Sequence, residues 1–148
     1  MYLLDTNALS ELVKKRPHPG FVERLRYHPA DAFFTSCICV MELRQGTSAR
    51  ADKESFWERI VRDVLTRFTI LGFGGKEAIV AGDVLAHLAK RGEVIGLEDV
   101  LIGSTALVRD YTVVTTNVRH FQRIPNLRVE NWHQDNRRTP HSAYTSER

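Results

Sequence analysis

Short apolar runs alternate along this chain with longer stretches in which apolar residues recur at helical spacing. Such alternation is typical of strands joined by crossover helices, which build a mostly parallel sheet with helices on both faces. The pattern therefore predicts a three-layer α/β protein with four to five strands. We expect strands over residues 2–4, 32–35, 68–71, 112–115 and 128–130, and helices over residues 8–13, 21–27, 38–46, 56–65, 79–88 and 98–109.

The chain has the size and balance of one domain, because its 148 residues are 43% hydrophobic and 26% charged. We assign residues 1–132 to this domain and the polar, aperiodic residues 133–148 to a flexible tail. The beginning, MYLLDTNALSEL, has neither the basic start nor the long apolar stretch of a secretory signal. No later run approaches the length of a membrane span, so we expect a cytoplasmic protein without a membrane partner.

Net charge and cysteine spacing bear on whether the protein binds polyanions, forms disulfides or holds zinc. A net charge of +3 and a pI near 9.1 lean toward polyanions, although many basic proteins bind no nucleic acid. Cys37 and Cys39, two positions apart in an apolar run, lack the spacing of a disulfide framework or a zinc site. We predict that both cysteines are small core residues.

Polar residues that follow the predicted strands point to a site at one edge of the sheet. Asp5 comes directly after the first strand and Asn117 follows the fourth, while Glu42 and Asp99 lie on helices that begin near the same edge. Ligands of open parallel sheets collect at the carboxyl ends of the strands, so we expect these side chains to share one crevice. Taken singly, Asp5 also fits a turn or helix cap, and Glu42 also fits a solvated helix face.

An acidic cluster of this kind is unfavourable without a cation, because like charges repel and burial penalises the ionised forms. Oxygen ligands suit Mg²⁺ or Mn²⁺, which bind one or two carboxylates together with water and phosphate oxygens. Such an ion activates water for hydrolysis at phosphorus. The small residues Gly103, Ser104 and Ala106 on the helix of Asp99 allow a close approach to neighbouring elements, which would bring Asp99 near the ion.

Four blocks carry a family resemblance: LLDTNALSEL, SCICVMELRQG, IGLEDVLIGSTAL and VVTTNVRHFQRIPNLRVENW follow one another between Tyr2 and Trp132. Together they resemble the successive motifs of the PIN-domain family, particularly its VapC and FitB-like toxins. The resemblance implies a PIN-like fold and a metal-dependent endoribonuclease that forms the toxin half of a toxin–antitoxin pair. It also implies cleavage of RNA to 5′-phosphate and 3′-hydroxyl ends.

By this resemblance, Asp5, Glu42 and Asp99 correspond to the family's acidic residues, and Asn117 takes the place of a fourth. We expect Asp5 and Asp99 to bind Mg²⁺ or Mn²⁺ directly, with Glu42 and Asn117 acting through water. Because Asn117 carries no charge, one tightly held ion is favoured over two. The positions expected to support the site by hydrogen bonds are Thr6, Asn7, Ser36 and Thr115.

His120 stands where the family often has another acidic residue. Two interpretations remain open: it contacts phosphate or carries a proton near neutral pH, or it is a surface side chain packed beside Phe121. Cations near the motif blocks are weak candidates for holding the RNA backbone, and each also fits as solubilising charge. These candidates are Arg44, Arg119, His120 and Arg123, with Arg50 and Lys53 as further cations.

The resemblance also implies partners: an RNA substrate, a small antitoxin that lays a helix in a groove, and a homodimer or larger toxin–antitoxin assembly. Three other classes of protein share part of this pattern. A dehalogenase-like phosphatase also has an Asp after its first strand, but it needs a second Asp where this chain has Asn7. A receiver domain needs an acidic pair at the same place. A PIN scaffold that only binds RNA or protein remains open because Asn117 replaces an acid.

Overall fold

The computed structural model describes residues 1–134 and has a parallel sheet at its centre. Five strands lie in the order β3-β2-β1-β4-β5, and every neighbouring pair is parallel. This confirms the predicted fold class. The strands are β1 (Tyr2–Leu4), β2 (Phe33–Ser36), β3 (Thr69–Leu71), β4 (Thr112–Val114) and β5 (Val129–Glu130).

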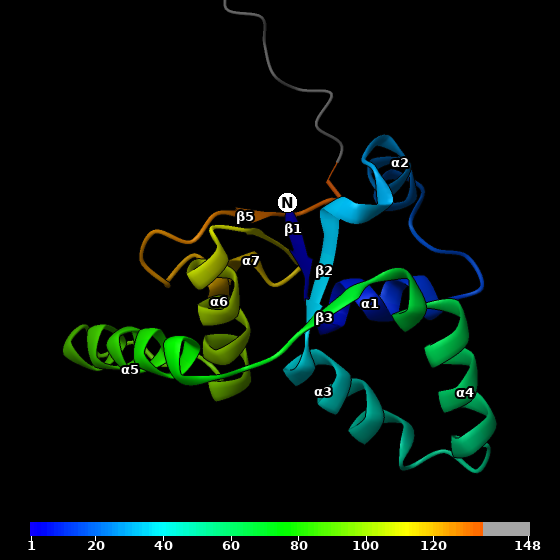
Figure 1. Ribbon diagram of the computed structural model, residues 1–148, viewed down its shortest axis with the longest axis horizontal. Coiled ribbons are helices and arrows are strands. Elements are labelled where there is room, and N and C mark those ends of the chain that lie inside the picture. Colours follow the sequence, from blue (N-terminus) through cyan, green and yellow to red (C-terminus); the bar gives the residue numbers. More distant parts are fainter. Residues whose placement is uncertain (135–148) are drawn as a thin grey trace, which may run out of the picture.

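Helices connect the strands and cover the sheet, as Figure 1 shows, with α5 and α6 side by side on one side of the strands and α1 and α4 on the other. Two 3₁₀ turns, Ala30–Ala32 and Leu65–Arg67, precede β2 and β3. The helices are α1 (Thr6–Val13), α2 (Pro19–Tyr27), α3 (Cys37–Thr47), α4 (Lys53–Asp63), α5 (Gly75–Lys90), α6 (Leu97–Arg109) and α7 (Val118–Phe121).

The central strands are buried on both faces, which explains their continuous apolar runs. Leu3 and Leu4 of β1 and Val113 of β4 have essentially no exposed surface. Leu3 lies opposite both Phe34 and Val113 in the registers of the two neighbouring strands. Because β1 is the middle strand, the residue that follows it emerges at the centre of the carboxyl edge of the sheet.

Several predicted boundaries differ from the structure by a few residues. Ala32 belongs to a 3₁₀ turn, so β2 begins at Phe33, and the helix expected over residues 56–65 ends at Asp63 before a second 3₁₀ turn. Helix α7 was not predicted, because four residues are too few for an apolar periodicity to be detected. This short helix carries part of the site described below.

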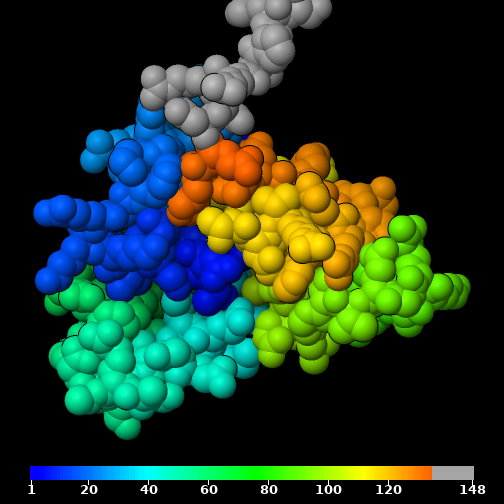
Figure 2. Space-filling view, turned by 180° about the vertical axis from the view of Figure 1, so that it is seen from behind, coloured from blue at the N-terminus to red at the C-terminus, as the bar shows by residue number. Residues whose placement is uncertain are grey.

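The segment after β5 closes the domain against the N-terminal part of the chain. Trp132 is 1% exposed, and its ring lies 5.0 Å from that of Tyr2 and 5.6 Å from that of His28. In Figure 2 this orange segment lies between the blue N-terminal part and the yellow part of the chain. His133, which we had assigned to the tail, stacks on Phe21 at 5.3 Å. The rest of the predicted flexible tail, residues 135–148, lies outside the described residues.

The remaining expectations concern Gly103, the cysteines and membrane spans. A Cβ on Gly103 would lie 2.5 Å from Ile124 Cδ1, so the small residue permits the close approach of the segment after α7 to α6.

Cys39 is fully buried and Cys37 is half-buried, and burial raises the pKa of the Cys39 thiol to about 12. Within residues 1–134, no helix is both long enough and apolar enough to cross a membrane.

Candidate metal centre

Asp5 is the N-cap of α1 and lies where β1 ends, between two hydrogen-bond donors. Its Oδ1 accepts from the Ala8 amide at 2.9 Å, and its Oδ2 accepts from Thr115 Oγ1 at 2.5 Å. The Asp5 amide donates to the Val114 carbonyl, which continues the β1–β4 ladder and sets Asp5 beside Thr115. The side chain is therefore both a helix cap and a carboxylate fixed at the sheet edge.

The ionised form of Asp5 is disfavoured although two groups donate to it. Burial leaves the residue 3% exposed and raises its pKa from 3.8 to about 6. The hydrogen bonds from Thr115 and Ala8 act in the opposite direction, while the negative charges of Asp99 and Glu42 raise the pKa further. A nearby cation would reverse this balance and favour the carboxylate.

Glu42 lies in the middle of α3, as expected from the helix predicted over residues 38–46. Thr6 Oγ1, in the first turn of α1, donates to Glu42 Oε1 at 2.6 Å. Ser36 caps α3 by accepting from the Ile38 amide at 3.0 Å, so it fixes the start of the helix that carries Glu42. Asn7 is exposed, and within residues 1–134 its side chain makes no recorded hydrogen bond.

Asp99 lies in the first turn of α6, and its side chain is 23% exposed. Its Oδ2 is 3.1 Å from Nδ1 of His120 and 3.4 Å from Nδ2 of Asn117. The carboxylate also benefits from the helix N-terminus, where a negative charge interacts favourably with the macrodipole. Asp99 therefore faces donors from a second element and remains accessible to solvent.

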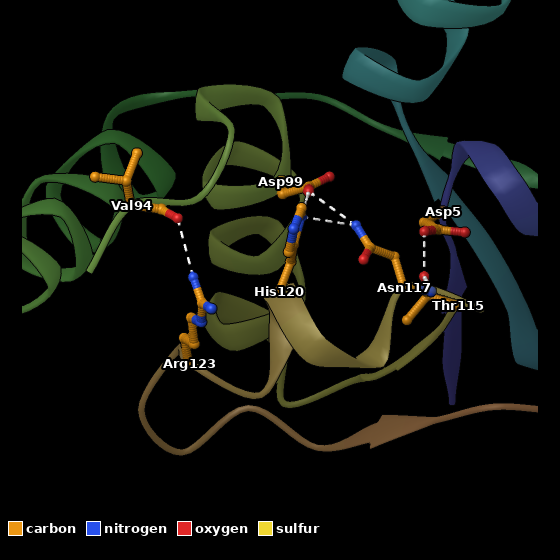
Figure 3. Close-up of polar contacts among 7 residues, drawn as sticks. All are labelled: Asp5, Val94, Asp99, Thr115, Asn117, His120 and Arg123. Atoms are coloured by element: carbon orange, nitrogen blue, oxygen red, sulfur yellow. Dashed lines mark hydrogen bonds and ion pairs between the residues drawn. The ribbon is translucent and has the colours of Figure 1, made fainter.

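Thr115 and Asn117 connect the two carboxylates. The Thr115 hydroxyl donates to Asp5 and accepts from the Asn117 amide N–H at 2.8 Å, so it fixes the turn that leads into α7. Asn117 and His120, one helical turn apart, then face Asp99 together. Figure 3 shows Asn117 between the Asp5–Thr115 pair and the Asp99–His120 pair.

His120 lies at the protein surface beside the Asp99 carboxylate. The ring is 43% exposed, as the surface interpretation expects, and its Nδ1 also lies 3.1 Å from Asp99 Oδ2 and 2.8 Å from Asn117 Nδ2, so both interpretations stay open. A neutral Nδ1 accepts from Asn117, whereas a protonated Nδ1 donates to Asp99. The spacing of Asn117 and His120 was the available signal, because residues three apart share a face once α7 is recognised.

Asn117, which we expect to act on an ion through water, presents its amide nitrogen to Asp99 and His120. Its carbonyl oxygen can face the same point only if the amide turns over. The reason is local, because Asp99 Oδ2 and an unprotonated His120 Nδ1 both accept hydrogen bonds. An ion bound to Asp99 would remove that preference.

The predicted RNA-binding arginines lie on both sides of these residues. Arg44 pairs with Glu54 at 3.1 Å and lies over Trp57, and Arg50 pairs with Asp52 at 2.9 Å. A cavity of about 540 Å³ next to Glu42 is lined by Arg50 together with two cations that we had not predicted, Lys14 and Arg59. Arg119 and Arg123 lie beside His120 on the other side, and Lys53 begins α4.

The donor set fits a hydrated cation. Within residues 1–134, no three His, Cys, Asp or Glu side chains lie close enough together to share one ion. Mg²⁺ keeps several waters in proteins and uses one or two carboxylates, so it does not need such a cage. The carboxylate of Asp5 keeps unused lone pairs beyond its two hydrogen bonds, and Asp99 is partly exposed.

Comparison with known proteins agrees with this architecture. The model of the PIN domain family matches residues 2–127. Ribonuclease VapC2 of Haemophilus influenzae is 36% identical over 88% of this chain and 97% of its own length. The tRNA(fMet)-specific endonuclease VapC of Salmonella typhimurium is 34% identical over the same shares.

A solved structure extends the likeness to three dimensions. VapBC2 from Rickettsia felis, bound to a DNA fragment from its promoter, superposes with a TM-score of 0.79 at 32% identity, over 88% of this chain and 98% of that one. The protein described here therefore belongs to the PIN domain family, within its VapC-like branch. Asp5, Glu42 and Asp99, hereafter the acidic centre, lie within the matched residues.

Proposed function

We propose that this protein is a Mg²⁺- or Mn²⁺-dependent endoribonuclease and the toxin of a toxin–antitoxin pair. The observation that carries the proposal is the buried Asp5 carboxylate, whose ionisation is opposed by burial and by the charges of Asp99 and Glu42. Burial and the neighbouring negative charges make the ionised form of Asp5 costly, and a bound cation would relieve that cost. Relatives of matching length that are named as VapC ribonucleases support the choice of reaction.

Two carboxylates would hold the ion directly and two further groups would act through water. Asp5 and Asp99 are the direct ligands in this proposal, because they lie at element ends on both sides of Asn117. Glu42, held by Thr6 at 2.6 Å, and Asn117 would orient bound water. One ion is favoured over two, since Asn117 contributes no charge to offset a second.

In this proposal, residues of the chain hold the metal ligands and the substrate phosphate in position. When bound, the divalent ion supplies activated water and offsets charge that develops on the phosphoryl oxygens. Thr115 holds Asp5 and the Asn117 backbone in one arrangement, which limits movement of the ligands. His120 lies beside Asp99 and is partly exposed, and in this proposal it would contact a phosphate oxygen or carry a proton near neutral pH.

The partners follow from the same proposal. RNA is the substrate, and the products carry 5′-phosphate and 3′-hydroxyl ends. A small antitoxin would bind this domain and place a basic side chain in the acidic centre, in a cytoplasmic assembly that contains a dimer of the nuclease. The support is that a solved relative is a VapBC complex on promoter DNA.

RNA cleavage tests the nuclease proposal. Purified protein should cut RNA in Mg²⁺ or Mn²⁺ and stop in EDTA, and small phosphomonoesters should remain intact. Asp99→Asn is the matched control, because it keeps the size of the side chain and removes one charge. Cleavage by this variant, cleavage in EDTA, or turnover of a phosphomonoester without RNA cleavage would contradict the proposal.

Growth tests the toxin role separately. Expression of the parent protein should arrest a bacterial host, and co-expression with the small protein encoded beside it should restore growth. Asp5→Asn, expressed to the same level, should be harmless. Arrest by Asp5→Asn as strong as by the parent would favour a binding module without turnover, the interpretation that Asn117 had left open.

A further inference from the structure

A second charged hollow lies beside the acidic centre and has no role in the proposed chemistry. This basic pocket, about 380 Å³ in volume, lies where the end of α5, the loop before α6 and helix α7 meet. Its polar lining consists of His87, Arg91, Glu93, Arg119, Gln122 and Arg123. Three arginines face one glutamate, so the lining carries a formal excess of two positive charges with His87 neutral.

The three arginines are available to a ligand in different degrees. Arg119 is exposed, and within residues 1–134 it has no recorded ion pair. Arg91 pairs with Glu93 at 3.1 Å, but both side chains face solvent, and such a pair contributes little stability and is easily exchanged. Arg123 donates from one guanidinium nitrogen to the Val94 carbonyl at 3.0 Å, which orients the group and leaves its other N–H donors free.

The backbone around the basic pocket is fixed. Helix α5 ends at Lys90, the φ of Gly92 just beyond it is 63° and lies in the left-handed region, and the Glu93 amide donates to the Leu88 carbonyl at 2.9 Å. This helix stop holds Arg91 and Glu93 in place on one wall. The opposite wall is α7, which also carries His120. Arg119 of the pocket and His120 beside Asp99 are therefore neighbours on the same short helix.

Figure 3 shows that Arg123 and Val94 lie on the side of Asp99 and His120 that faces away from Asp5. A chain of phosphates that passes over the acidic centre could thus continue toward Arg119 and Arg123. Guanidinium groups bind phosphate oxygens through two parallel donors, and an exposed polar hollow suits a solvated backbone better than an apolar ligand.

We propose that the basic pocket binds a backbone phosphate of the substrate RNA, adjacent to the bond that is cut. This inference rests on the proposed ribonuclease function and adds a subsite to it. The contact is electrostatic and does not depend on the base, so the pocket supplies affinity and register along the strand. Arg119 and Arg123 provide the charge, and Gln122 supplies a neutral donor beside them.

RNA binding in EDTA tests the subsite without turnover. A fluorescent single-stranded RNA of 12 nucleotides would be titrated with parent, Arg119→Ala and Arg123→Gln over a series of salt concentrations. Gln at position 123 keeps a donor for the Val94 carbonyl and removes the charge. Loss of one phosphate contact should lower the slope of log K against log salt by about 0.7, which corresponds to about fourfold weaker binding at 0.15 M salt and about eightfold at 0.05 M.

Arg16→Ala is the matched control, because Arg16 is also exposed without a recorded ion pair within residues 1–134 but lies in the loop between α1 and α2. It should bind RNA like the parent. Arg119→Lys keeps the charge and should retain the salt slope of the parent. Equal binding by Arg119→Ala and the parent, or equal weakening by Arg16→Ala, would overturn the subsite and leave the nuclease proposal standing. A parent that neither binds nor cuts RNA would overturn both.

Discussion

The two sides of the acidic centre differ in burial and in the kind of contact that holds them. Asp5 is 3% exposed, caps a helix, and is fixed by donors from α1 and from the end of β4. The side chains of Asp99 and His120 are 23% and 43% exposed. They contact each other through His120 Nδ1, which donates to Asp99 Oδ2 only when that nitrogen carries a proton. One side is rigid and electrostatically costly, whereas the other is solvated and adaptable.

This difference assigns different tasks to the two carboxylates. In the proposed function, the buried side stores unfavourable charge that an ion would relieve, so it would supply the driving force for metal binding. The exposed side can exchange its protein donors for water, ion or phosphate without opening the core. The protein thus keeps its fixed charge near the centre of the sheet and its exchangeable contacts on the side where we propose that the substrate binds.

The largest expected effect is the loss of cleavage when either carboxylate is neutralised. Asp5→Asn and Asp99→Asn should each lower RNA cleavage by more than about 100-fold, because groups that merely support metal ligands are already worth 10- to 100-fold. Rates in Mg²⁺ and Mn²⁺, measured on a gel with circular dichroism as a folding control, test this. Parent-like cleavage by either variant would show that its side of the centre does not hold the ion.

The pH dependence of the stability of the metal-free protein should distinguish the buried side of the acidic centre from the exposed side. The folded-state pKa of Asp5, about 6, lies above its ordinary value of 3.8, so folding favours the protonated form. Stability should therefore fall as pH rises from about 4 to about 6, by roughly 3 kcal/mol from this group. Asp5→Asn should then be more stable than the parent at pH 7.5 and equal to it near pH 4, although it is inactive.

Denaturant unfolding followed by the fluorescence of buried Trp132 measures this difference. Asp99→Asn is the matched control, since it removes the same charge from a side chain that is 23% exposed, whereas Asp5 is 3% exposed. If Asp5→Asn and Asp99→Asn have the same stability profile, the contrast between a buried and a solvated side is wrong.

A smaller effect is expected from the two threonines that hold the carboxylates. Thr115→Val removes the donor that lowers the pKa of Asp5, so the stability transition should move to higher pH and cleavage should fall about tenfold. Thr6→Val removes the 2.6 Å contact to Glu42 and should lower cleavage without moving that transition. A shift of the transition in Thr6→Val, or none in Thr115→Val, would contradict the assignment of these hydrogen bonds.

The smallest effect should come from Asn117, which carries no charge. Asn117→Ala should reduce cleavage less than Thr115→Val does, because the backbone contact from residue 117 to Thr115 survives the substitution. Asn117→Asp adds a charge beside Asp99 and should tighten Mn²⁺ binding or recruit a second ion. Cleavage rates of both variants over a series of Mn²⁺ concentrations measure this. An inactive Asn117→Ala would contradict the ranking and indicate that the reaction is centred on residues of α7.

Much of this architecture could be predicted because strand periodicity and chain order leave few arrangements for a parallel sheet. The position of Asp5 after the first strand, and of Ser36 before α3, followed directly from local pattern. Asp99 was placed near the others by the rule that ligands gather at the carboxyl edge. These inferences depend on residues next to regular elements.

The contacts across α7 could not be predicted in the same way. A four-residue helix gives no periodic signal, so neither the turn that brings His120 to Asp99 nor the basic pocket on its other face was visible. The orientation of the Asn117 amide depends on two acceptors from distant parts of the chain. Lys14 and Arg59 likewise reach the cavity beside Glu42 only through the packing of α1 and α4 against α3.

Calorimetric titration of Mn²⁺ into the metal-free protein tests the central claim most directly. The account predicts one ion per chain in the parent at pH 7.5 and weaker binding below pH 6, where Asp5 becomes protonated. Binding should be lost in Asp5→Asn and Asp99→Asn and retained in Asn117→Ala. Binding of Mn²⁺ by Asp5→Asn as tight as by the parent would contradict the claim that the buried carboxylate holds the ion.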